Sequence, residues 1–290
     1  MHKAELGAEW YPVVRRQQCA LNHPAAFCLV PFFEHSRPLV FAHRGGCALG
    51  PENTLAAFDR GLAAGADGLE LDVHLSADGV AVVHHDSTLD RTTSACGPLA
   101  ARTAAELAQV DAGCRFAGGG TFPFRGQGVG IPTLAEVLHR YPDLRLIVEM
   151  KVDSGEMGAA VARDVGRAGA AERVCVAGYG ARSAAAARAA LPEMASSACH
   201  AEVRLAVYRA WARWPVRRAS YGGYQVPERS GVMRIVSPRF VRYAHRAALK
   251  VQVWTVDLED DMRRLLAWGV DGLISNHPDV AVHVRDSFTW

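Results

Sequence analysis

The sequence predicts an α/β barrel in which parallel strands are wrapped by helices. Short β-rich runs alternate with Ala-rich helical segments from Leu39 onward, as expected for parallel strands linked by helices. A chain of 290 residues with 50% hydrophobic side chains can also bury the core of one barrel of roughly 250 residues. Residues 1–38 show no clear period, so we expect an N-terminal extension there and a barrel domain over 39–285.

Nine β-rich runs are candidates for the strands of this barrel. They are 39–43, 68–74, 80–85, 145–150, 173–178, 197–201, 223–226, 250–256 and 271–275. Because a barrel of this kind has eight strands, 197–201 or 223–226 is expected to be irregular or to lie outside it.

Helical segments are expected between these runs. They are 54–64, 133–140, 157–169, 181–190 and 258–268. Thr133 followed by Glu136 has the spacing of a capping box, and Gly269 follows the last helical segment, where a terminating glycine is common. The stretch from Ser87 to Gly130 is long for a loop and predicts a small insertion after the third strand, over one end of the barrel.

The charge and the cysteines exclude several classes of protein. A net charge of +2 with a pI near 8.2 is too balanced to indicate a nucleic-acid partner. The 7 cysteines are scattered without a CxxC spacing, so we expect neither a disulfide framework nor a zinc site, and a reducing, cytoplasmic compartment fits best. The apolar run 25–33 is short and contains Pro31, which predicts neither a signal peptide nor a membrane span. The oligomeric state stays open.

Two acidic residues and a histidine are expected to meet through a hairpin. Asp78-Gly79 between two β-rich runs is typical of a two-residue turn. If 77 pairs with 80, then Asp72 lies directly across from His85, and alternation places Glu70 on the same face as Asp72. The nearby His74 and His84 are better explained as structural histidines.

These carboxylates are candidate ligands for a divalent metal. Oxygen ligands suit hard cations such as Mg²⁺ and Ca²⁺, and Glu149, which ends the apolar run 146–148, is a natural third ligand after Glu70 and Asp72. A solvated strand edge is the plain alternative. However, a charged face inside a barrel requires a neutralising partner, which favours the metal site.

Basic residues close to these positions are candidate phosphate ligands. His43 follows the buried run 39–42, where active-site residues of such barrels lie, and Arg44 is adjacent to it. Lys151 lies two residues after Glu149 and projects from the same strand face. Arg offers a planar fork of donors and Lys a compact charge, so both suit a phosphate.

Three further residues are expected around this site. Trp254 closes an apolar run at a strand mouth, where it lines the pocket for a leaving alcohol or simply packs in the core. Glu52 and Asn53 are expected to support the site by capping the helix that starts at Thr54 and by hydrogen-bonding the loop. Contact of Glu52 with the metal is a further alternative.

The ordered motifs resemble those of the glycerophosphodiester phosphodiesterase family. They are His43-Arg44-Gly45, Pro51-Glu52-Asn53-Thr54, Glu70-Leu71-Asp72-Val73, His85-Asp86, Leu89-Asp90-Arg91-Thr92-Thr93, Val148-Glu149-Met150-Lys151, Val253-Trp254-Thr255-Val256 and Val270-Asp271-Gly272. The resemblance implies a TIM-type (β/α)8 barrel with a divalent metal on Glu70, Asp72 and Glu149. It also implies that His43 and His85 act as the acid and the base.

The implied activity is metal-dependent hydrolysis of glycerophosphodiesters, such as glycerophosphocholine or glycerophosphoethanolamine, to glycerol 3-phosphate and an alcohol. The nucleophile is either water or the glycerol 2-hydroxyl through a cyclic phosphate, and the sequence does not assign acid and base between the histidines. Two departures from the family pattern are Asn276, where Asp is common, and Asp257, where Asn is usual. The first removes a carboxylate at the barrel mouth, which can alter hydrogen bonding in the pocket, but we expect neither departure to touch the catalytic set.

Three alternatives remain. The first is a lysophospholipase D or sphingomyelinase D activity on lipid phosphodiesters, because the segment 203–218 mixes basic and aromatic residues in a way that suits weak contact with a membrane surface. The plain explanation of this segment is a surface helix that packs its Leu, Tyr and Trp side chains on the barrel. The second is a barrel that only binds a phosphorylated ligand. The third, a cysteine enzyme based on Cys47, has little support.

Overall fold

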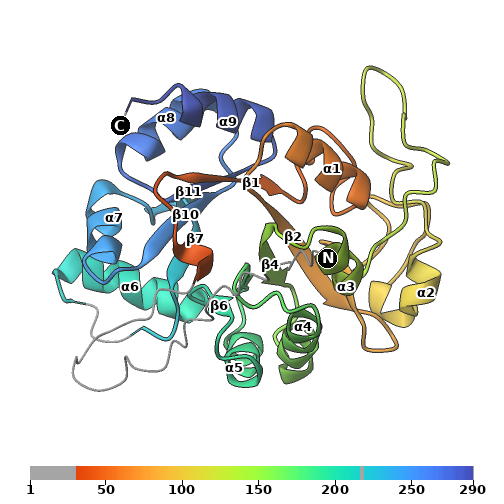
Figure 1. The fold of residues 1–290 in the computed structure, drawn as a ribbon, viewed down its shortest axis with the longest axis horizontal. Helices are drawn as coiled ribbons and strands as arrows, with labels where there is room; N and C mark the ends of the chain where they lie inside the picture. Colours follow the sequence, from red (N-terminus) through yellow and green to blue (C-terminus); the bar gives the residue numbers. More distant parts are fainter. Residues whose placement is uncertain (1–30, 216–218, 290) are drawn as a thin grey trace, which may run out of the picture.

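The computed structural model describes residues 31–215 and 219–289, and these form a barrel of parallel strands surrounded by helices (Figure 1). The strands are hydrogen-bonded in the order β6-β5-β4-β2-β1-β11-β10-β7. A parallel bridge between Ser197 and Gly223 joins the two ends of this order, so the barrel is nearly closed. The barrel strands are β1 (Leu39–His43), β2 (Gly68–Leu75), β4 (Arg145–Met150), β5 (Val174–Ala177), β6 (Ala195–Ser196), β7 (Gly223–Pro227), β10 (Lys250–Trp254) and β11 (Gly272–Ser275).

The predicted fold class is confirmed, but two strand assignments need correction. The expected strand 197–201 is wrong. The strand at this place is β6, which holds two residues and ends before 197, and helix α6 (His200–Ala212) already begins at His200. The strand outside the barrel is neither 197–201 nor 223–226. It is β3 (Ala81–Val83), which pairs antiparallel with β2 alone and forms a hairpin on the barrel rim.

Helices cover the outside of the barrel. They are α1 (Leu55–Ala63), α2 (Ala104–Leu107), α3 (Leu134–Arg140), α4 (Gly155–Arg167), α5 (Ala181–Ala190), α6, α7 (Pro238–His245), α8 (Glu259–Ala267) and α9 (Pro278–Asp286). The predicted capping box at Thr133 and Glu136 is present. Helices α7 and α9 were not predicted, although each has a proline at its first turn, a position that favours helix initiation.

The hairpin between β2 and β3 has a different register from the one expected. Val73 pairs with Val83 and Leu75 with Ala81, because the loop between Ser76 and Val80 holds three residues rather than two. His84, not His85, is therefore bonded to Asp72 through its backbone. His85 still reaches the barrel mouth, because β3 ends at Val83 and the chain leaves the strand there.

Side chains alternate along each strand, and the ones that face inward form an apolar barrel interior with charged residues at its rim. Leu39 and Phe41 of β1 point into the barrel, and His43 follows them on the same face. In β4 the same alternation places Ile147 below Glu149. The inward side chains therefore change from apolar to ionisable toward the C-terminal ends of the strands.

The other end of the barrel is closed by residues that precede the first strand. The short helix η1 (Pro31–Phe33) inserts Phe32 and Phe33, both almost fully buried, among the inward side chains of the barrel. Gly222 leaves the space that Phe33 fills, since a Cβ there would lie 2.3 Å from the Phe33 ring. The described part of the expected extension thus packs on the barrel, while residues 1–30 lie outside the described residues.

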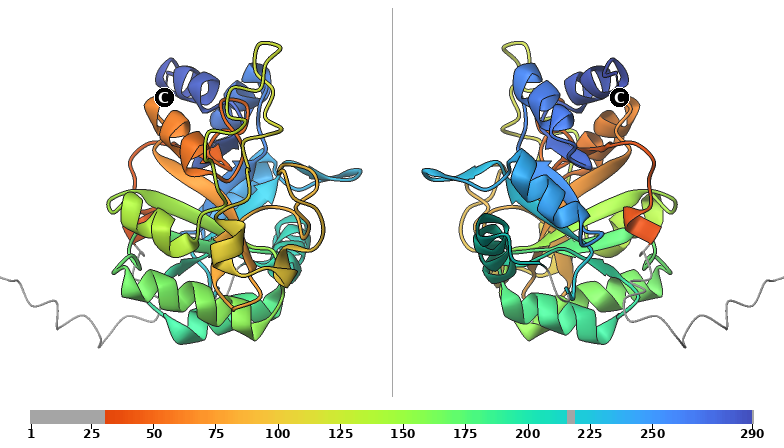
Figure 2. Two further views of the ribbon diagram at one scale, coloured as in Figure 1. Left: turned by 90° about the vertical axis from the view of Figure 1, so that its right-hand side faces the viewer. Right: turned by 90° about the vertical axis from the view of Figure 1, so that its left-hand side faces the viewer.

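Two segments project beside the barrel mouth. The expected insertion holds only the short helices η2 (Leu99–Ala101) and α2 within Ser87 to Gly130. The second segment is the hairpin of β8 (Arg229–Ser230) and β9 (Met233–Arg234), which extends away from the barrel on the same side as α6 (Figure 2). None of the described helices combines the length and apolar character needed to cross a membrane.

Candidate active site

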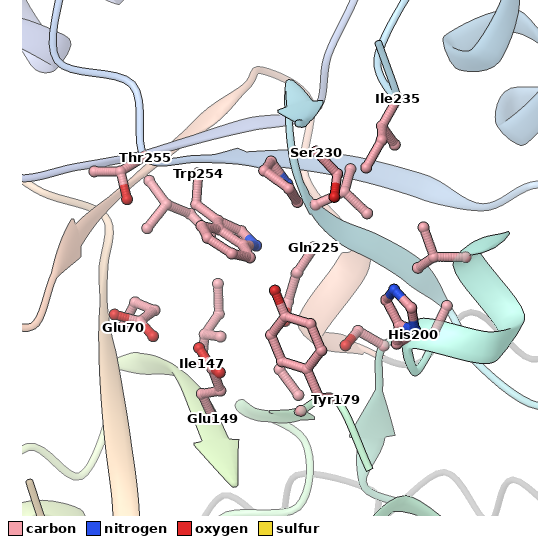
Figure 3. A pocket seen from close by; sticks show the side chains of 18 of the residues that line it. Glu70, Ile147, Glu149, Tyr179, His200, Gln225, Ser230, Ile235, Trp254 and Thr255 are labelled. Carbon is pink, nitrogen blue, oxygen red and sulfur yellow. The ribbon is translucent and has the colours of Figure 1, made fainter. Parts of the chain in front are cut away.

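A cavity of about 480 Å³ opens at the C-terminal ends of the barrel strands (Figure 3). Most of the predicted site residues line it: His43, Arg44, Glu70, His85, Glu149, Lys151 and Trp254. Glu52, Asn53 and Asp72 are not in this lining, and they contact the residues that are. The residues selected from the sequence therefore come together at one end of the barrel.

Three carboxylates form the most acidic part of the cavity. One oxygen from each of Glu70, Asp72 and Glu149 lies within 4.8 Å of the others. Burial raises the pKa of Glu70 well above its ordinary value, and the charges of Asp72 and Glu149 raise it further. Burial likewise raises the pKa of Glu149. Charges this close and this buried repel one another, and a divalent cation would remove the repulsion.

Asp72 is held from two sides. Asn53 donates from Nδ2 to Oδ2 of Asp72 at 2.8 Å and accepts from the Asp72 backbone amide, so the two residues exchange a pair of hydrogen bonds. On the other side, Nζ of Lys151 lies 3.3 Å from Asp72 and 3.1 Å from Glu149. Burial lowers the pKa of Lys151, but these two carboxylates outweigh burial and raise it.

Arg44 links Glu52 to two of the three clustered carboxylates, Glu70 and Asp72. Its backbone has φ 51°, a left-handed conformation, and its amide donates to Glu70 at 3.1 Å. Its side chain bonds Glu52 at 3.0 Å and lies 3.2 Å from Asp72 in an ion pair. The buried Nε of Arg44 has no aligned hydrogen-bond acceptor among the described residues. This guanidinium is therefore charged, desolvated and not fully bonded.

His85 is oriented by a network that the sequence analysis missed. Its Nδ1 lies 2.6 Å from Oδ1 of Asp86, and Arg91 bonds both Asp86 and Glu52, at 2.6 Å and 2.7 Å. Arg91 lies in the LDRTT motif and Asp86 directly follows His85. Both residues therefore belong to motifs found in the sequence, but the sequence alone did not indicate what they do. Glu52 belongs to this network and does not cap α1, where the Thr54 side chain accepts from the Ala57 amide.

His43 is oriented by the two residues that depart from the family pattern. Its Nδ1 lies 2.6 Å from Oδ1 of Asn276, and Nδ2 of Asn276 donates to Asp257 at 2.7 Å. The expectation that neither departure touches the catalytic set is therefore wrong. Burial lowers the pKa of His43, and the hydrogen bond that its Nδ1 makes to Oδ1 of Asn276 only partly opposes this. Nε2 of His43 faces the carboxylates and lies 3.8 Å from Glu70.

The other two histidines of the hairpin bond backbone carbonyls, in agreement with the structural role expected for them. Nε2 of His74 lies 3.0 Å from the carbonyl of His85, and Nε2 of His84 lies 3.1 Å from that of Thr88. Both side chains are buried, and burial lowers the pKa of each. Their bonds fix the loop that carries His85.

The far half of the cavity is largely apolar. Glu70 and Glu149 lie on one side, and Trp254 and Tyr179 stand between them and the second half (Figure 3). The apolar side chains of this second half come from α6, β7, β9 and the segment after β9, and polar side chains such as His200 and Gln225 lie among them. The apolar ones are Val203, Val207, Val226, Met233 and Ile235. The cavity therefore offers a polar floor for a phosphate and an apolar wall for whatever the phosphate carries.

Comparisons with known proteins agree with this arrangement. The model of the glycerophosphoryl diester phosphodiesterase family matches residues 43–280. A glycerophosphodiester phosphodiesterase from Caldanaerobacter subterraneus is 32% identical over 257 residues, which cover 86% of this chain and 98% of the relative.

Two solved structures share the fold and about a quarter of the sequence. The glycerophosphoryl diester phosphodiesterase domain of a Mycobacterium tuberculosis protein has a TM-score of 0.75 at 26% identity and covers 86% of this chain and 100% of that chain. An Oleispira antarctica phosphodiesterase in complex with the product sn-glycerol-3-phosphate has a TM-score of 0.68 at 26% identity, covering 87% of this chain and 98% of that chain.

The fold and the site define a phosphoric diester hydrolase on a TIM-type barrel. The chain belongs to the glycerophosphoryl diester phosphodiesterase family.

Proposed function

We propose that this enzyme hydrolyses glycerophosphodiesters, such as glycerophosphocholine and glycerophosphoethanolamine, to glycerol 3-phosphate and an alcohol, and that it requires Mg²⁺ or Ca²⁺. The observation that carries the proposal is the cluster of three carboxylates beside two histidines and two basic side chains at one end of the cavity. The Oleispira relative with bound sn-glycerol-3-phosphate supports the product. A cytoplasmic location stays a prediction.

The donor set fits a hard divalent cation. Glu70, Asp72 and Glu149 offer carboxylate oxygens, which Mg²⁺ and Ca²⁺ prefer, and the raised pKa values of Glu70 and Glu149 reflect burial and crowding that a bound cation would relieve. A cation held there would polarise the phosphoryl oxygens and neutralise the charge that develops on them.

Arg44 and Lys151 bind the non-bridging oxygens of the phosphodiester in this proposal. Both are charged, both face the cavity, and the Nε of Arg44 lacks an aligned acceptor. Their carboxylate partners hold them in place before substrate arrives, so little reorganisation is needed when charge develops on the phosphoryl group. The indole of Trp254 lies beside the carboxylates and packs against the departing alcohol.

Hydrogen-bond partners support His43 as the base in this proposal. The carboxylate of Asp257 can only accept, so the amide of Asn276 turns its nitrogen to Asp257 and its oxygen to His43. Nδ1 of His43 must then donate, which leaves the lone pair on Nε2, toward the substrate. In the proposed reaction, Nε2 takes the proton from the attacking hydroxyl group, which belongs to water or to the glycerol 2-position.

His85 supplies the proton for the leaving group. Its Nδ1 bonds the carboxylate of Asp86, which stabilises a positively charged ring, and Arg91 holds that carboxylate in position. Nε2 of His85 donates its proton to the bridging oxygen as the P–O bond to the alcohol breaks. If a cyclic phosphate forms, the two histidines exchange roles when water opens it.

A lipid phosphodiester is the second candidate substrate, because apolar side chains line the part of the cavity away from the carboxylates. Val203, Val207, Ile235 and Met233 are among them. An acyl chain would bury apolar surface there, as expected for a lysophospholipase D or sphingomyelinase D activity.

The test is release of the alcohol from glycerophosphocholine, glycerophosphoethanolamine and lysophosphatidylcholine, in chelator alone or with Mg²⁺ or Ca²⁺. We expect metal-dependent release from the first two substrates, together with glycerol 3-phosphate, and its loss in His43→Ala. Preference for the lysolipid would move the assignment to the second candidate. No release from any of these substrates by folded protein, whatever the metal, would overturn both.

A further inference from the structure

The part of the chain that contains most of α6, which lines the active-site cavity, and all of α7 carries an excess of positive charge. Between residues 203 and 256 the chain has eleven Lys and Arg residues and one acidic residue, Glu228, although the whole chain has 32 Lys and Arg against 30 Asp and Glu. Glu228 is already paired with Arg264 and Arg234. This stretch of the chain is thus strongly basic, while the remainder of the chain is acidic.

Four of these arginines line one cavity. A second cavity, of about 430 Å³, lies between the C-terminal end of α6 and α7, and it is lined by Arg213, Arg239, Arg242 and Arg246. The last three share one face of α7 by their spacing. None of the four has an ion pair or a side-chain hydrogen bond with any other residue in 31–215 or 219–289.

The hydroxyl group of Tyr243 is a second observation that indicates a ligand in this cavity, and it does not depend on charge. Its side chain lines the same cavity, the residue is 9% exposed, and its buried hydroxyl has no hydrogen-bond partner within the described part of the chain. An unsatisfied buried hydroxyl is costly, so an acceptor from outside the chain would stabilise it. Arginine forks around a hydroxyl donor suit the oxygens of a phosphate group.

Apolar side chains next to this cavity face solvent. Trp211 is 78% exposed, Trp214 is 67% exposed and Tyr208 is 57% exposed, while Val203, Ala206 and Ala210 form the buried face of α6. The simpler expectation, that this segment packs its Leu, Tyr and Trp side chains on the barrel, is therefore wrong. Exposed tryptophans flanked by arginines are typical of the interface between water and lipid head groups.

The hairpin of β8 and β9 extends the same surface. Val232 at its tip is fully exposed and Met233 is partly exposed. The hairpin projects from the barrel on the side where α6 lies (Figure 2). Tyr208 and Met233 also line the active-site cavity, so two of the exposed apolar side chains lie where a substrate enters.

We propose that the surface formed by α6, α7 and the β8–β9 hairpin docks on an anionic lipid bilayer, with a lipid phosphate in the arginine-lined cavity and Trp211, Trp214 and Val232 in the interfacial layer. Charge complementarity selects the lipid surface, and the exposed aromatic side chains distinguish it from a soluble phosphate. Docking turns the active-site mouth toward the membrane. The proposal does not depend on the catalytic assignment.

Co-sedimentation of the full chain with vesicles tests the proposal. Vesicles of phosphatidylcholine are compared with equal mixtures of phosphatidylcholine and phosphatidylglycerol, at low and at physiological ionic strength. We expect binding to the anionic vesicles that weakens as salt is added, and little binding to phosphatidylcholine alone.

Paired variants distinguish binding at the arginine-lined cavity from nonspecific attraction between the charged protein and the vesicles. Arg242→Gln with Arg246→Gln should weaken binding to anionic vesicles by about tenfold or more, since each basic residue near the surface contributes. Trp211→Ala with Trp214→Ala should also weaken it and lower the salt-resistant fraction. Arg167→Gln with Arg263→Gln, on α4 and α8, removes the same charge elsewhere and should change affinity by less than about twofold. Turnover of glycerophosphocholine should be unchanged in the α7 pair, which shows that the protein is folded.

Three results would overturn the proposal. One is the absence of binding to anionic vesicles at low salt. Another is an equal loss in the α7 pair and the control pair, which would indicate nonspecific attraction. The third is a different occupant of the surface: inorganic phosphate bound by calorimetry without vesicle binding, or self-association in sedimentation velocity that Trp211→Ala with Trp214→Ala abolishes.

Discussion

The Oδ1 atom of Asn276 lies 2.6 Å from Nδ1 of His43, and the opposite end of the same amide is held by Asp257. Asn276 stands where the family pattern commonly has Asp, and in this chain the carboxylate of Asp257 acts on His43 through the Asn276 amide. The exchange keeps the histidine oriented while its immediate partner is neutral.

The first prediction concerns this orientation. In Asp257→Asn the new amide can donate as well as accept, so Asn276 is free to turn its nitrogen toward His43 and favour the wrong tautomer. We expect kcat to fall about tenfold or more with little change in KM, as is usual for loss of an orienting partner. The double variant Asp257→Asn with Asn276→Asp should recover most of the activity. Unchanged kcat in the single variant would contradict the assigned tautomer.

The second prediction is that replacing either catalytic histidine lowers kcat more than replacing a residue that only positions one of them. His43→Ala and His85→Ala should each lower kcat by ~10² or more, because each removes a proton-transfer group. Arg91→Gln leaves His85 in place but releases Asp86, so its loss should be smaller, about tenfold. Steady-state kinetics with glycerophosphocholine would measure this order. An Arg91 variant as damaged as His85→Ala would mean that Arg91 contacts the substrate.

Metal binding should be visible without turnover. A cation that binds only the folded protein raises its unfolding temperature, so Mg²⁺ or Ca²⁺ should stabilise chelator-treated wild type in a thermal melt. Glu70→Gln and Asp72→Asn should abolish this rise, whereas Glu156→Gln, an exposed acid on α4, should keep it. Because the three carboxylates repel one another, Glu70→Gln should be at least as stable as wild type in chelator. An unaltered cation response in both triad variants would exclude this site.

Cys47 should be unreactive despite its place beside the active site. Burial and the charge of Glu52 raise the pKa of its thiol to about 11, so very little thiolate is present at pH 8. Iodoacetamide should modify the exposed Cys96 long before Cys47, as followed by peptide mass spectrometry. Cys47→Ala should keep most of the activity. Rapid labelling of Cys47 with parallel loss of turnover would revive a cysteine mechanism.

Asp271 should make the fold sensitive to acid. Burial raises the pKa of Asp271, but hydrogen bonds from His245, the Val251 amide and Lys250 outweigh it, and the pKa is lowered overall. Its stabilising contribution is therefore complete above its ordinary pKa of 3.8 and is lost as pH falls through the lower folded value.

We expect Asp271→Asn to reduce the free energy of unfolding by about 2 to 4 kcal/mol at pH 7. The deficit relative to wild type should shrink below pH 4, as measured by urea unfolding at pH 7, 4 and 3. A deficit that stays constant over this range would mean that the aspartate acts through packing rather than charge.

Alternation and capping signals predicted most of the fold, because β1, β4 and α5 depend on local patterns that the sequence displays directly. The errors fall where local patterns are ambiguous. The Asp78-Gly79 turn admits loops of two or three residues, which shift the register by one. Strand β6 holds two residues and is too short to show alternation.

Most of the residues chosen from the sequence line one cavity, but the partners that orient them were not predicted. Glu70, Asp72 and His43 stand at strand ends, where position alone indicates a role. Asn276 contacts His43 from a loop far along the chain, and Arg91 acts on His85 only through Asp86. These contacts depend on backbone paths and side-chain rotamers that no spacing encodes. The apolar half of the cavity depends on α6 and the β8–β9 hairpin for the same reason.

Among the described residues, Phe32 and Phe33 close the end of the barrel opposite the active site. Substrate must enter, and both products must leave, through the rim that holds the charged residues. A phosphate product lingering on Arg44 and Lys151 then stands in the path of the next diester. We therefore expect glycerol 3-phosphate to inhibit the enzyme competitively, because substrate and product use the same opening of the barrel.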